Sequence, residues 1–243
     1  MITSPQNEKL KLVRKLHERK HREREGLFAT EGEDLIAAGL AAGLEPRFTL
    51  TAAGSQLPSE WGGEEVDPEL LASVSALGSG TRAIAVWPLT WSRRPAPPCF
   101  YLHGVSDPGN VGTIIRSVDA LLGSSVVLGP DCADPFAPKA VRASMGSLFA
   151  RPPVRGGLDV TPRPRAALVA HGGDGLDSLA GAATICLGAE RDGLPPELLA
   201  ECEAEATIPL RAGGAESLNV AAAAAIAAQW ISSPAMGEGR PDA

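Results

Sequence analysis

The chain has 243 residues, of which 44% are hydrophobic and 21% charged, and its formal net charge at pH 7 is −7. This length predicts a globular protein with one large domain or two small ones. Scattered Gly and Pro exclude a collagen-like repeat, and no apolar run reaches the roughly 20 residues of a membrane span. The amino-terminal residues lack the apolar segment of a secretory signal. The four cysteines form no CxxC pair, so we expect a cytoplasmic protein with neither disulfides nor a zinc site.

The first 24 residues are basic, although the whole chain is acidic. They carry a net charge of +5, which leaves −12 on the remainder. A basic arm on an acidic body is typical of polyanion binding, whereas a solvated, salt-bridged helix gives the same composition. These residues alone favour neither interpretation. The basic side chains are Lys9, Lys11, Arg14, Lys15, Arg19, Lys20, Arg22 and Arg24.

The amino-terminal part, residues 1–90, predicts a small α/β domain. Apolar spacing predicts a helix over residues 8–24, and Asp67 and Pro68 form a cap-and-proline start for another helix. The remaining predicted elements are a strand at 28–30, a helix at 32–42, a strand at 47–51 and a strand at 83–87.

Residues 91–98 have the composition of a linker, and strand and helix signals alternate after them. The predicted strands are 99–105, 125–128, 166–170, 183–187 and 206–210. The predicted helices are 111–122, 137–146, 195–203 and 217–231. Such alternation predicts an α/β domain over residues 99–232, with a mostly parallel sheet and helices on both faces. The tail, 233–243, has the composition of a disordered segment.

The segment 107–117 follows a predicted strand and opens a predicted helix. Asn110 is a candidate cap for that helix, and Gly109 and Gly112 leave the backbone open to a ligand. Arg116 follows the apolar run 111–115. It therefore pairs with a buried carboxylate, faces a substrate phosphate, or extends into solvent from an ordinary turn.

Two further segments place polar residues after predicted strands. Residues 187–194 contain a glycine turn and Glu190, and residues 208–220 contain a glycine loop followed by Ser217 and Asn219. Ligands of parallel α/β sheets bind beyond the carboxyl ends of the strands. Taken singly, the first segment is more typical of a surface loop and the second is compatible with a capped core helix. The alanine-rich stretch 221–228 also permits close approach of another backbone, as in a dimer.

Together these segments resemble the SpoU (TrmH) family of RNA ribose 2′-O-methyltransferases, within the SPOUT superfamily. The first family motif has an asparagine and then an arginine, matched by Asn110 and Arg116. The second has a Leu-Gly-x-Glu turn followed by Gly-Leu, matched within 187–194. The third has Ile-Pro-Leu, a loop and Ser-Leu-Asn-Val, matched within 208–220. Residues 134–146 and the amino-terminal part are similar to the family as well, so the resemblance covers nearly the whole chain.

The resemblance implies S-adenosyl-L-methionine (AdoMet) as methyl donor, a deep trefoil knot in residues 99–232, an L30e-like substrate-binding domain in residues 1–90, and a homodimer. It also implies RNA contact by the basic amino-terminal residues. The implied cofactor-binding residues are Ala170, Leu187, Gly188, Ile208, Leu210 and Leu218. The implied catalytic residues are Arg116, which grips phosphate and polarises the hydroxyl, and four that orient it and the ribose: Asn110, Glu190, Ser217 and Asn219. The sequence departs from the family in a longer loop at 211–216 and in Leu122, where glycine is common.

The implied activity is methylation of a ribose 2′-hydroxyl, with 23S ribosomal RNA as the first substrate and transfer RNA as the second. Because a neutral thioether is already a good leaving group, no metal is expected, and no membrane partner is expected. A non-catalytic, ribosome-associated RNA-binding protein on the same scaffold is the alternative, against which the complete set of motif residues argues. A nucleotide-binding oxidoreductase is disfavoured, because no GxGxxG follows a strand.

Overall fold

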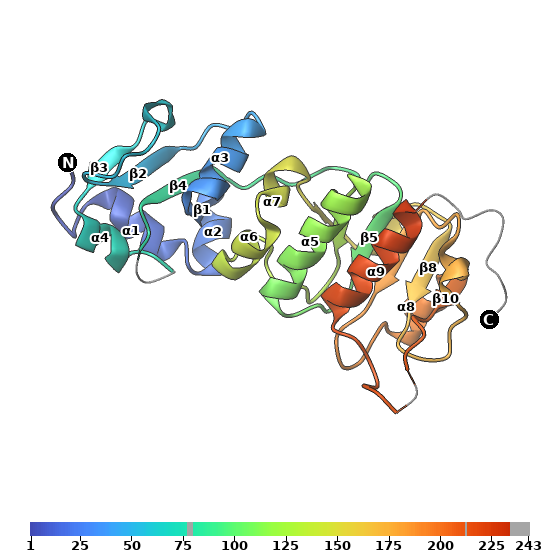
Figure 1. The fold of residues 1–243 in the computed structure, drawn as a ribbon. Coiled ribbons are helices and arrows are strands. Elements are labelled where there is room, and N and C mark those ends of the chain that lie inside the picture. The colour runs from blue at the N-terminus through green and yellow to red at the C-terminus, as the bar shows by residue number, and fades with distance from the viewer. Residues whose placement is uncertain (77–79, 212, 234–243) are drawn as a thin grey trace. The chain divides into compact units, whose positions relative to one another are not determined.

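The computed structural model describes residues 1–76, 80–211 and 213–233, and it divides into two compact units (Figure 1). The N-terminal unit contains residues 1–91 and 134–150, and the C-terminal unit contains residues 92–133 and the described chain from 151 onward. The division at residue 91 coincides with the start of the predicted linker. Residues 134–150, however, pack with the N-terminal unit, although they lie within the sequence range of the predicted C-terminal domain. Except for Ser233, the predicted disordered tail lies outside the described residues.

The N-terminal unit is built on a four-stranded sheet in the order β1-β4-β2-β3. Its strands are β1 (Leu27–Glu31), β2 (Phe48–Ala52), β3 (Glu64–Val66) and β4 (Ala83–Pro88). β4 pairs antiparallel with β1 and β2, whereas β2 and β3 are parallel. The unit also contains α3 (Glu33–Ala41), the single turn η1 (Ser59–Trp61) and α4 (Pro68–Ser73). Asp67 caps α4 as predicted, because its carboxylate accepts from the backbone N–H of Glu69 and Leu70.

The helix predicted over residues 8–24 is wrong in its continuity. The structure has two helices, α1 (Glu8–Lys15) and α2 (Arg19–Glu25), separated by three residues. The break leaves the carbonyl groups of Leu16 and His17 without helical partners, and Arg22 donates hydrogen bonds to both, at 2.7 and 2.8 Å. The side chain of Arg22 therefore completes the turn that the apolar spacing did not reveal.

Two apolar layers hold the N-terminal unit together. Leu10, Val13 and Leu16 of the first helical segment are buried in one cluster with residues of β2 and β4. A separate aromatic cluster joins β1 and β4 to Phe136, which lies just before α6 (Pro138–Ser144), and to α7 (Ser147–Ala150). Within it, the ring centroids of Phe28 and Trp87, on adjacent strands, lie 5.8 and 5.0 Å from that of Phe149. These ring contacts explain why residues 134–150 belong with this unit.

The C-terminal unit contains a six-stranded sheet in the order β10-β8-β9-β5-β6-β7, with every pair of neighbours parallel. The strands are β5 (Cys99–Leu102), β6 (Val126–Leu128), β7 (Val154–Arg155), β8 (Arg165–Leu168), β9 (Thr184–Leu187) and β10 (Ala204–Ala206). The predicted parallel sheet is confirmed. The strand predicted at 206–210 is misplaced, since β10 ends at Ala206 and Pro209 has no N–H for a sheet hydrogen bond.

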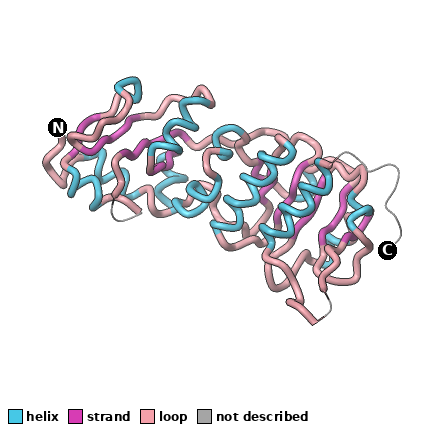
Figure 2. Tube along the Cα trace, viewed as in Figure 1, coloured by secondary structure: helices cyan, strands magenta, loops and turns pink. Residues whose placement is uncertain are grey.

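Helices cover both faces of this sheet, as predicted. Figure 1 shows α5 (Pro108–Leu122) and α9 (Val220–Ser232) side by side across one face, and Figure 2 shows the strands behind them. On the other face, Leu198 and Leu199 of α8 (Pro196–Leu199) pack against a cluster that includes Tyr101. Two single turns, η2 (Leu158–Val160) and η3 (Leu176–Leu179), complete the unit. Across the described parts of the chain, no helix has the length and apolar character to cross a bilayer.

Tyr101 gives the C-terminal unit a measurable pH dependence. It is the chain's single tyrosine, and its side chain is buried on β5. Burial, aided by Cys132, Cys186 and Asp159, raises the pKa of the phenol to about 12, whereas the unfolded chain has a pKa of about 10. The fold therefore favours the neutral phenol. Its contribution to the free energy of unfolding is complete below pH ~10 and is lost as the pH rises toward 12.

We expect Tyr101→Phe to flatten the alkaline limb of the stability curve. Urea unfolding between about pH 9 and 11 should show the wild type losing stability more steeply than the variant. The ultraviolet absorbance of tyrosinate should appear at higher pH in the folded wild type than in the urea-unfolded chain. Equal alkaline slopes in the two proteins would contradict the raised pKa.

Candidate active site

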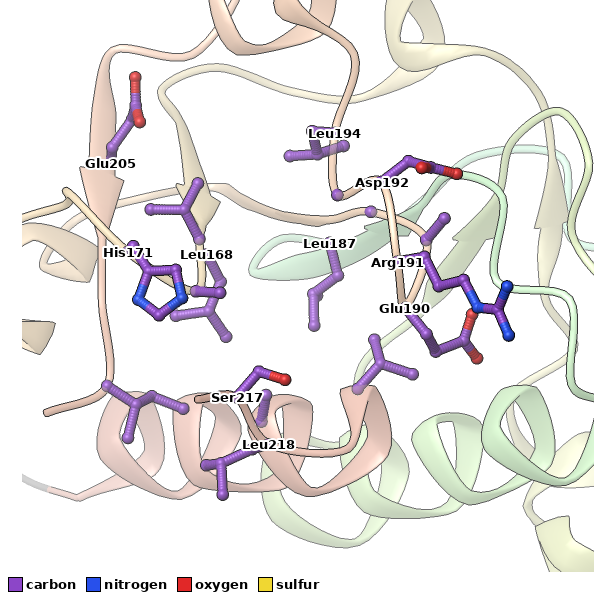
Figure 3. A pocket seen from close by; sticks show the side chains of 18 of the residues that line it. Leu168, His171, Leu187, Glu190, Arg191, Asp192, Leu194, Glu205, Ser217 and Leu218 are labelled. Atoms are coloured by element: carbon purple, nitrogen blue, oxygen red, sulfur yellow. The ribbon is translucent and has the colours of Figure 1, made fainter. Parts of the chain in front are cut away.

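A pocket of about 400 Å³ opens at the carboxyl edge of the parallel sheet. Its walls are residues 168–171 at the end of β8, residues 187–194 at the end of β9, and residues 208, 210, 217 and 218 between β10 and α9. Figure 3 shows His171 at one end, Glu190 at the other and Leu187 between them. The volume is within the range of small-molecule sites, and the edge of the sheet is the one where such sites form.

All six residues predicted to bind the cofactor line this pocket: Ala170, Leu187, Gly188, Ile208, Leu210 and Leu218. They come from three segments that are far apart in the sequence. The parallel strands bring the segments together, because each segment directly follows a strand or precedes α9. Leu210 and Leu218 remain 39% and 38% exposed, so apolar surface is open to a ligand here.

Gly188 is required for the shape of the loop after β9. The backbone groups of Ala189 and Gly193 exchange two hydrogen bonds, at 3.1 and 3.0 Å, and fold residues 189–193 back on themselves. A Cβ atom at position 188 would lie 2.0 Å from the carbonyl carbon of Gly193 and 2.2 Å from the nitrogen of Leu194. The close approach of two backbones therefore excludes any side chain at position 188.

A chain of side-chain hydrogen bonds joins the three motifs beside the pocket. The amide of Asn219 donates to the Oδ1 atom of Asn110 at 3.1 Å, and the amide of Asn110 donates to the Oε1 atom of Glu190 at 2.9 Å. Glu190 and Ser217 line the pocket itself. Four of the five residues predicted to be catalytic thus lie at or beside one site.

The helix caps at this site differ from the predicted ones. Asp107, and not Asn110, caps α5, because its Oδ1 atom accepts from the backbone N–H of Asn110 at 2.9 Å. This leaves the side-chain amide of Asn110 available for Glu190 and Asn219. Asn219 caps α9 by accepting from the N–H groups of Ala221 and Ala222, so the same side chain starts a helix and joins the hydrogen-bond chain.

Arg116 is the predicted catalytic residue that the structure does not bring into the pocket. It lies on α5 six residues after Asn110, which places it about 9 Å along the helix and roughly 120° around it. Its side chain is exposed and forms no ion pair or hydrogen bond with the described residues. A single copy of the chain therefore presents Arg116 to solvent rather than to the pocket.

The predicted RNA-binding residues lie in the N-terminal unit and differ in how far their charge is neutralised. Five form ion pairs at the surface: Lys9, Lys11, Arg19, Lys20 and Arg24. Arg14 donates only to neutral groups, Pro5 and Ser73, and Lys15 has no ion-pair partner among the described residues. The five ion-paired residues fit the interpretation as a salt-bridged helix surface. Arg14 and Lys15 keep charges that are not neutralised by an ion pair, as the interpretation as a basic arm requires.

Arg22 must be removed from the predicted RNA-binding set. Only 3% of its surface is exposed. Its guanidinium forms an ion pair with Asp134 at 2.7 Å, in addition to the hydrogen bonds to Leu16 and His17. All of these groups belong to the N-terminal unit, so the buried Arg22 stabilises that unit and is not presented to a phosphate in solvent.

Several residues that line the pocket are absent from the predicted binding set. His171, Asp192 and Glu205 carry polar side chains in the lining, and Leu194, Val220 and Ala223 are apolar. His171 directly follows Ala170 at the end of β8, so the rule that ligands bind beyond strand ends was a sufficient signal for it. The described residues contain no group of three or more His, Cys, Asp or Glu side chains that could hold a metal ion.

The parallel sheet, the pocket at its carboxyl edge and the converging loops define an α/β protein that binds a small organic molecule. Comparison with known proteins identifies the family. The profile of the SpoU rRNA Methylase family matches residues 97–229, and that of the MRM3-like substrate binding domain matches residues 7–81. This chain therefore belongs to the SpoU rRNA methylase family, as its motifs predicted.

Relatives resemble the chain over nearly its whole length. The 23S rRNA (guanosine(2553)-2′-O)-methyltransferase RlmP of Bacillus subtilis is 32% identical over 239 residues, which cover 93% of this chain and 96% of that protein. The AdoMet-bound rRNA methyltransferase of Sinorhizobium meliloti has a TM-score of 0.81 and 29% identity, covering 93% and 95% of the two chains. The AdoMet complex of the SpoU methyltransferase AviRb from Streptomyces viridochromogenes has a TM-score of 0.79 and 25% identity, covering 92% and 96%.

We expect the two contacts of Asn219, the helix cap and the bond to Asn110, to be separable by substitution. Asn219→Ala removes both the helix cap and the bond to Asn110, so it should lower the free energy of unfolding by about 1 kcal/mol. Asn219→Asp keeps an acceptor for the cap but loses the amide donor. Urea unfolding should therefore show near-normal stability for the Asp variant, while both variants lose methyl transfer. Full activity in Asn219→Asp would show that the bond to Asn110 has no part in the reaction.

Proposed function

We propose that the protein transfers a methyl group from AdoMet to a ribose 2′-hydroxyl of 23S ribosomal RNA. The observation that carries this proposal is the hydrogen-bond chain Asn219–Asn110–Glu190, which gathers all three motifs beside a pocket of the right size. The relatives support the substrate, since RlmP is named as a 23S rRNA 2′-O-methyltransferase. They also support the cofactor, since two structural relatives contain AdoMet.

The pocket residues fit the proposed cofactor. AdoMet has a flat adenine, a polar ribose and a charged methionine end, and it supplies an electrophilic methyl group on a sulfonium. The walls offer apolar side chains at Leu187, Leu210 and Leu218 together with backbone groups of the loops after β8 and β9. Gly188 lines the pocket without a side chain, so bare backbone faces the ligand at this point of the loop after β9.

The protein's own residues have to align the ribose hydroxyl and remove its proton. We assign the orientation of the ribose to Glu190, Asn110 and Asn219, at the end of the pocket near α5, and to Ser217 in its lining. We assign to Arg116 the grip on the adjacent phosphate and the polarisation of the hydroxyl, whose proton passes to a phosphate oxygen or water. The guanidinium acts through its charge and its N–H donors and is not the base.

We further propose that the protein acts as a homodimer. Arg116 does not line the pocket of its own chain, so the site is incomplete without a second source of that guanidinium. On α9, the exposed side chains Ala222, Ile226 and Gln229 recur at the spacing of one helical face, which leaves an exposed face for a second copy. The partner's Arg116 would then reach the site across the interface.

Three finer features of the resemblance are also part of this proposal. We infer that the C-terminal unit contains the deep trefoil knot of the superfamily and that residues 1–90 have the L30e-like fold. Family membership supports the first, and the match to the MRM3-like substrate binding domain supports the second. We place the protein in the cytoplasm, where bacterial ribosomal RNA is made.

RNA contact by the basic amino-terminal residues is now assigned chiefly to Arg14 and Lys15. Deleting residues 1–24 would not test it, because Leu10, Val13 and Leu16 belong to the core. We expect the double variant Arg14→Ala/Lys15→Ala to bind AdoMet normally and RNA more weakly. The slope of log affinity against log salt should become shallower by roughly 0.7 for each lost phosphate contact. An unchanged slope would show that these residues are only solvated.

The proposed activity is tested by mapping 2′-O-methyl sites in RNA from cells with and without the gene. A site in 23S rRNA that disappears without the gene, and returns when purified protein and AdoMet are added, is the expected result. A lost site in transfer RNA would support the runner-up substrate. Absence of tritium transfer from labelled AdoMet to bulk RNA would favour the non-catalytic RNA-binding protein.

A further inference from the structure

A second pocket, of about 420 Å³, lies in the C-terminal unit outside the active site. Residues 93–95 and Pro97 form one side of it, and residues 160–162 form the other. The first segment precedes β5 and the second precedes β8. Since the strands are parallel, this pocket lies at the amino edge of the sheet and the active-site pocket lies at the carboxyl edge. The two edges are separated by the length of β8, which has four residues and spans about 13 Å.

The side that carries Arg93 and Arg94 is an ordered segment, although its composition is that of a linker. The backbone N–H of Ser92 donates to the carbonyl of Pro153 at 3.0 Å. Farther along, Ala96 is held from both sides, because its N–H donates to Ser125 Oγ at 3.2 Å and its carbonyl accepts from Ser124 Oγ at 2.6 Å. Pro95, which lies between these anchors, restricts the backbone further. The two arginines are therefore presented from a fixed backbone.

The charges of Arg93 and Arg94 are not neutralised within the described chain. Both side chains are exposed, and neither forms an ion pair with a described residue, Asp159 included. The neighbouring Arg163 is different, because Glu201 and Glu203 both pair with it. The pocket thus has two free guanidinium groups on one side, while the nearby glutamates are already engaged.

We propose that this pocket binds a phosphodiester group of the RNA substrate, outside the methyl-transfer site. The inference rests on the proposed function, which makes RNA the substrate. Two guanidinium groups on adjacent residues provide planar forks that match phosphate oxygens. Val160, which is 42% exposed, and the prolines give an apolar wall for a ribose or a base edge. No aromatic ring lines the pocket, so the contact is made to the backbone of the RNA rather than by stacking its bases.

The distance between the two pockets explains why such a contact is useful. A nucleotide whose ribose is at the carboxyl edge cannot place its own phosphate at the amino edge, across the length of β8. The linker arginines therefore hold RNA that flanks the target nucleotide. They should affect how tightly a long RNA binds and should leave the chemical step unchanged.

The test compares Arg93→Ala/Arg94→Ala with a control that removes the same charge elsewhere. Arg82 and Arg151 suit the control because both are about half exposed and each pairs with an acid, Glu33 and Asp119 respectively. Fluorescence anisotropy measures binding of a labelled 23S rRNA transcript at several salt concentrations. Calorimetric titration with AdoMet shows that each variant is folded.

We expect the Arg93/Arg94 double variant to bind the transcript roughly tenfold more weakly, with a salt slope shallower by about 1.4, as for two lost phosphate contacts. Its KM for RNA should rise while kcat at saturating RNA stays at the wild-type value. Arg93→Lys/Arg94→Lys should restore the salt slope but only part of the affinity, because lysine keeps the charge and lacks the fork. The control should retain the wild-type slope.

Two results would overturn the inference. RNA binding by the Arg93/Arg94 variant that equals the wild type would assign the pocket to another ligand. An equal loss in the Arg82/Arg151 control would show that only net charge matters. The binding titration needs no methyl transfer, so failure of the proposed function is seen separately, as a wild-type protein that binds the transcript but does not methylate it.

Discussion

Arg116→Ala is expected to lower kcat/KM for RNA by about 10³-fold or more while AdoMet still binds with near-normal affinity. The loss should be large because a guanidinium aimed at developing charge acts in the transition state. Cofactor affinity should persist because Arg116 is exposed on α5 and does not line the pocket. Calorimetric titration with AdoMet beside a tritium-transfer assay measures both quantities. A variant that fails to bind AdoMet would show that Arg116 belongs to the cofactor site.

Arg116→Lys distinguishes two roles for the same charge. Lysine keeps the positive charge but loses the planar fork that grips phosphate with two bonds. If Arg116 positions the phosphate and hydroxyl together, the lysine variant should lose nearly as much activity as the alanine variant. Retention of most activity would reduce Arg116 to a distant counter-charge.

Gly188→Ala is expected to abolish measurable AdoMet binding. The added Cβ would lie 2.0 Å from the carbonyl carbon of Gly193, and this obstacle is backbone that cannot rotate away. The loop after β9 would have to open, and it forms one wall of the pocket. Gly175→Ala is the matched control, because a Cβ there meets nothing within 4 Å and its backbone φ is −65°.

Calorimetry should detect no AdoMet binding by Gly188→Ala, and normal binding by Gly175→Ala. Urea unfolding of both variants shows whether the change is local to the loop. Normal affinity in Gly188→Ala would mean that the β9 loop does not contact the cofactor.

Mixing the two inactive proteins tests the proposed dimer. If the partner's Arg116 completes the site, a heterodimer of Arg116→Ala and Gly188→Ala chains contains one intact site, made from the pocket of the first chain and the arginine of the second. Random exchange of subunits should then restore about a quarter of the wild-type activity. A mixture that stays inactive, or light scattering that shows a fully active monomer, would contradict the proposal.

The parts of the site that sequence predicted are those fixed by strand ends. Leu187 ends a short apolar strand and Gly188 follows it, and Ile208 and Leu210 come after another strand, so the parallel sheet brings together residues that the family resemblance implied. Arg116 was named by the same motifs, but its direction was not predictable. Asn110 lies on the side of α5 that faces Glu190, whereas Arg116 lies on another side of the same helix. Because Asp107 caps the helix, the side chain of Asn110 is free to bond to Glu190.

The parts that sequence did not predict depend on contacts between distant residues. The apolar spacing of residues 8–24 fits one helix, whereas the break is stabilised by Arg22, which Asp134 holds from 112 residues away. Residues 134–150 join the N-terminal unit through ring contacts that no local pattern indicates. The two-residue strand β7 was too short to produce a signal.

The path of residues 134–150 limits how this protein can be recombined with its relatives. A chimaera that joins at the linker would take positions 28 and 87 from one parent and positions 136 and 149 from the other. The rings that pack together in this chain would then come from two different parents. Arg22 and Asp134 would be divided in the same way. A graft that keeps the N-terminal unit of this chain intact therefore takes residues 134–150 together with the amino-terminal part, because a graft of one without the other replaces one partner of the Arg22–Asp134 pair.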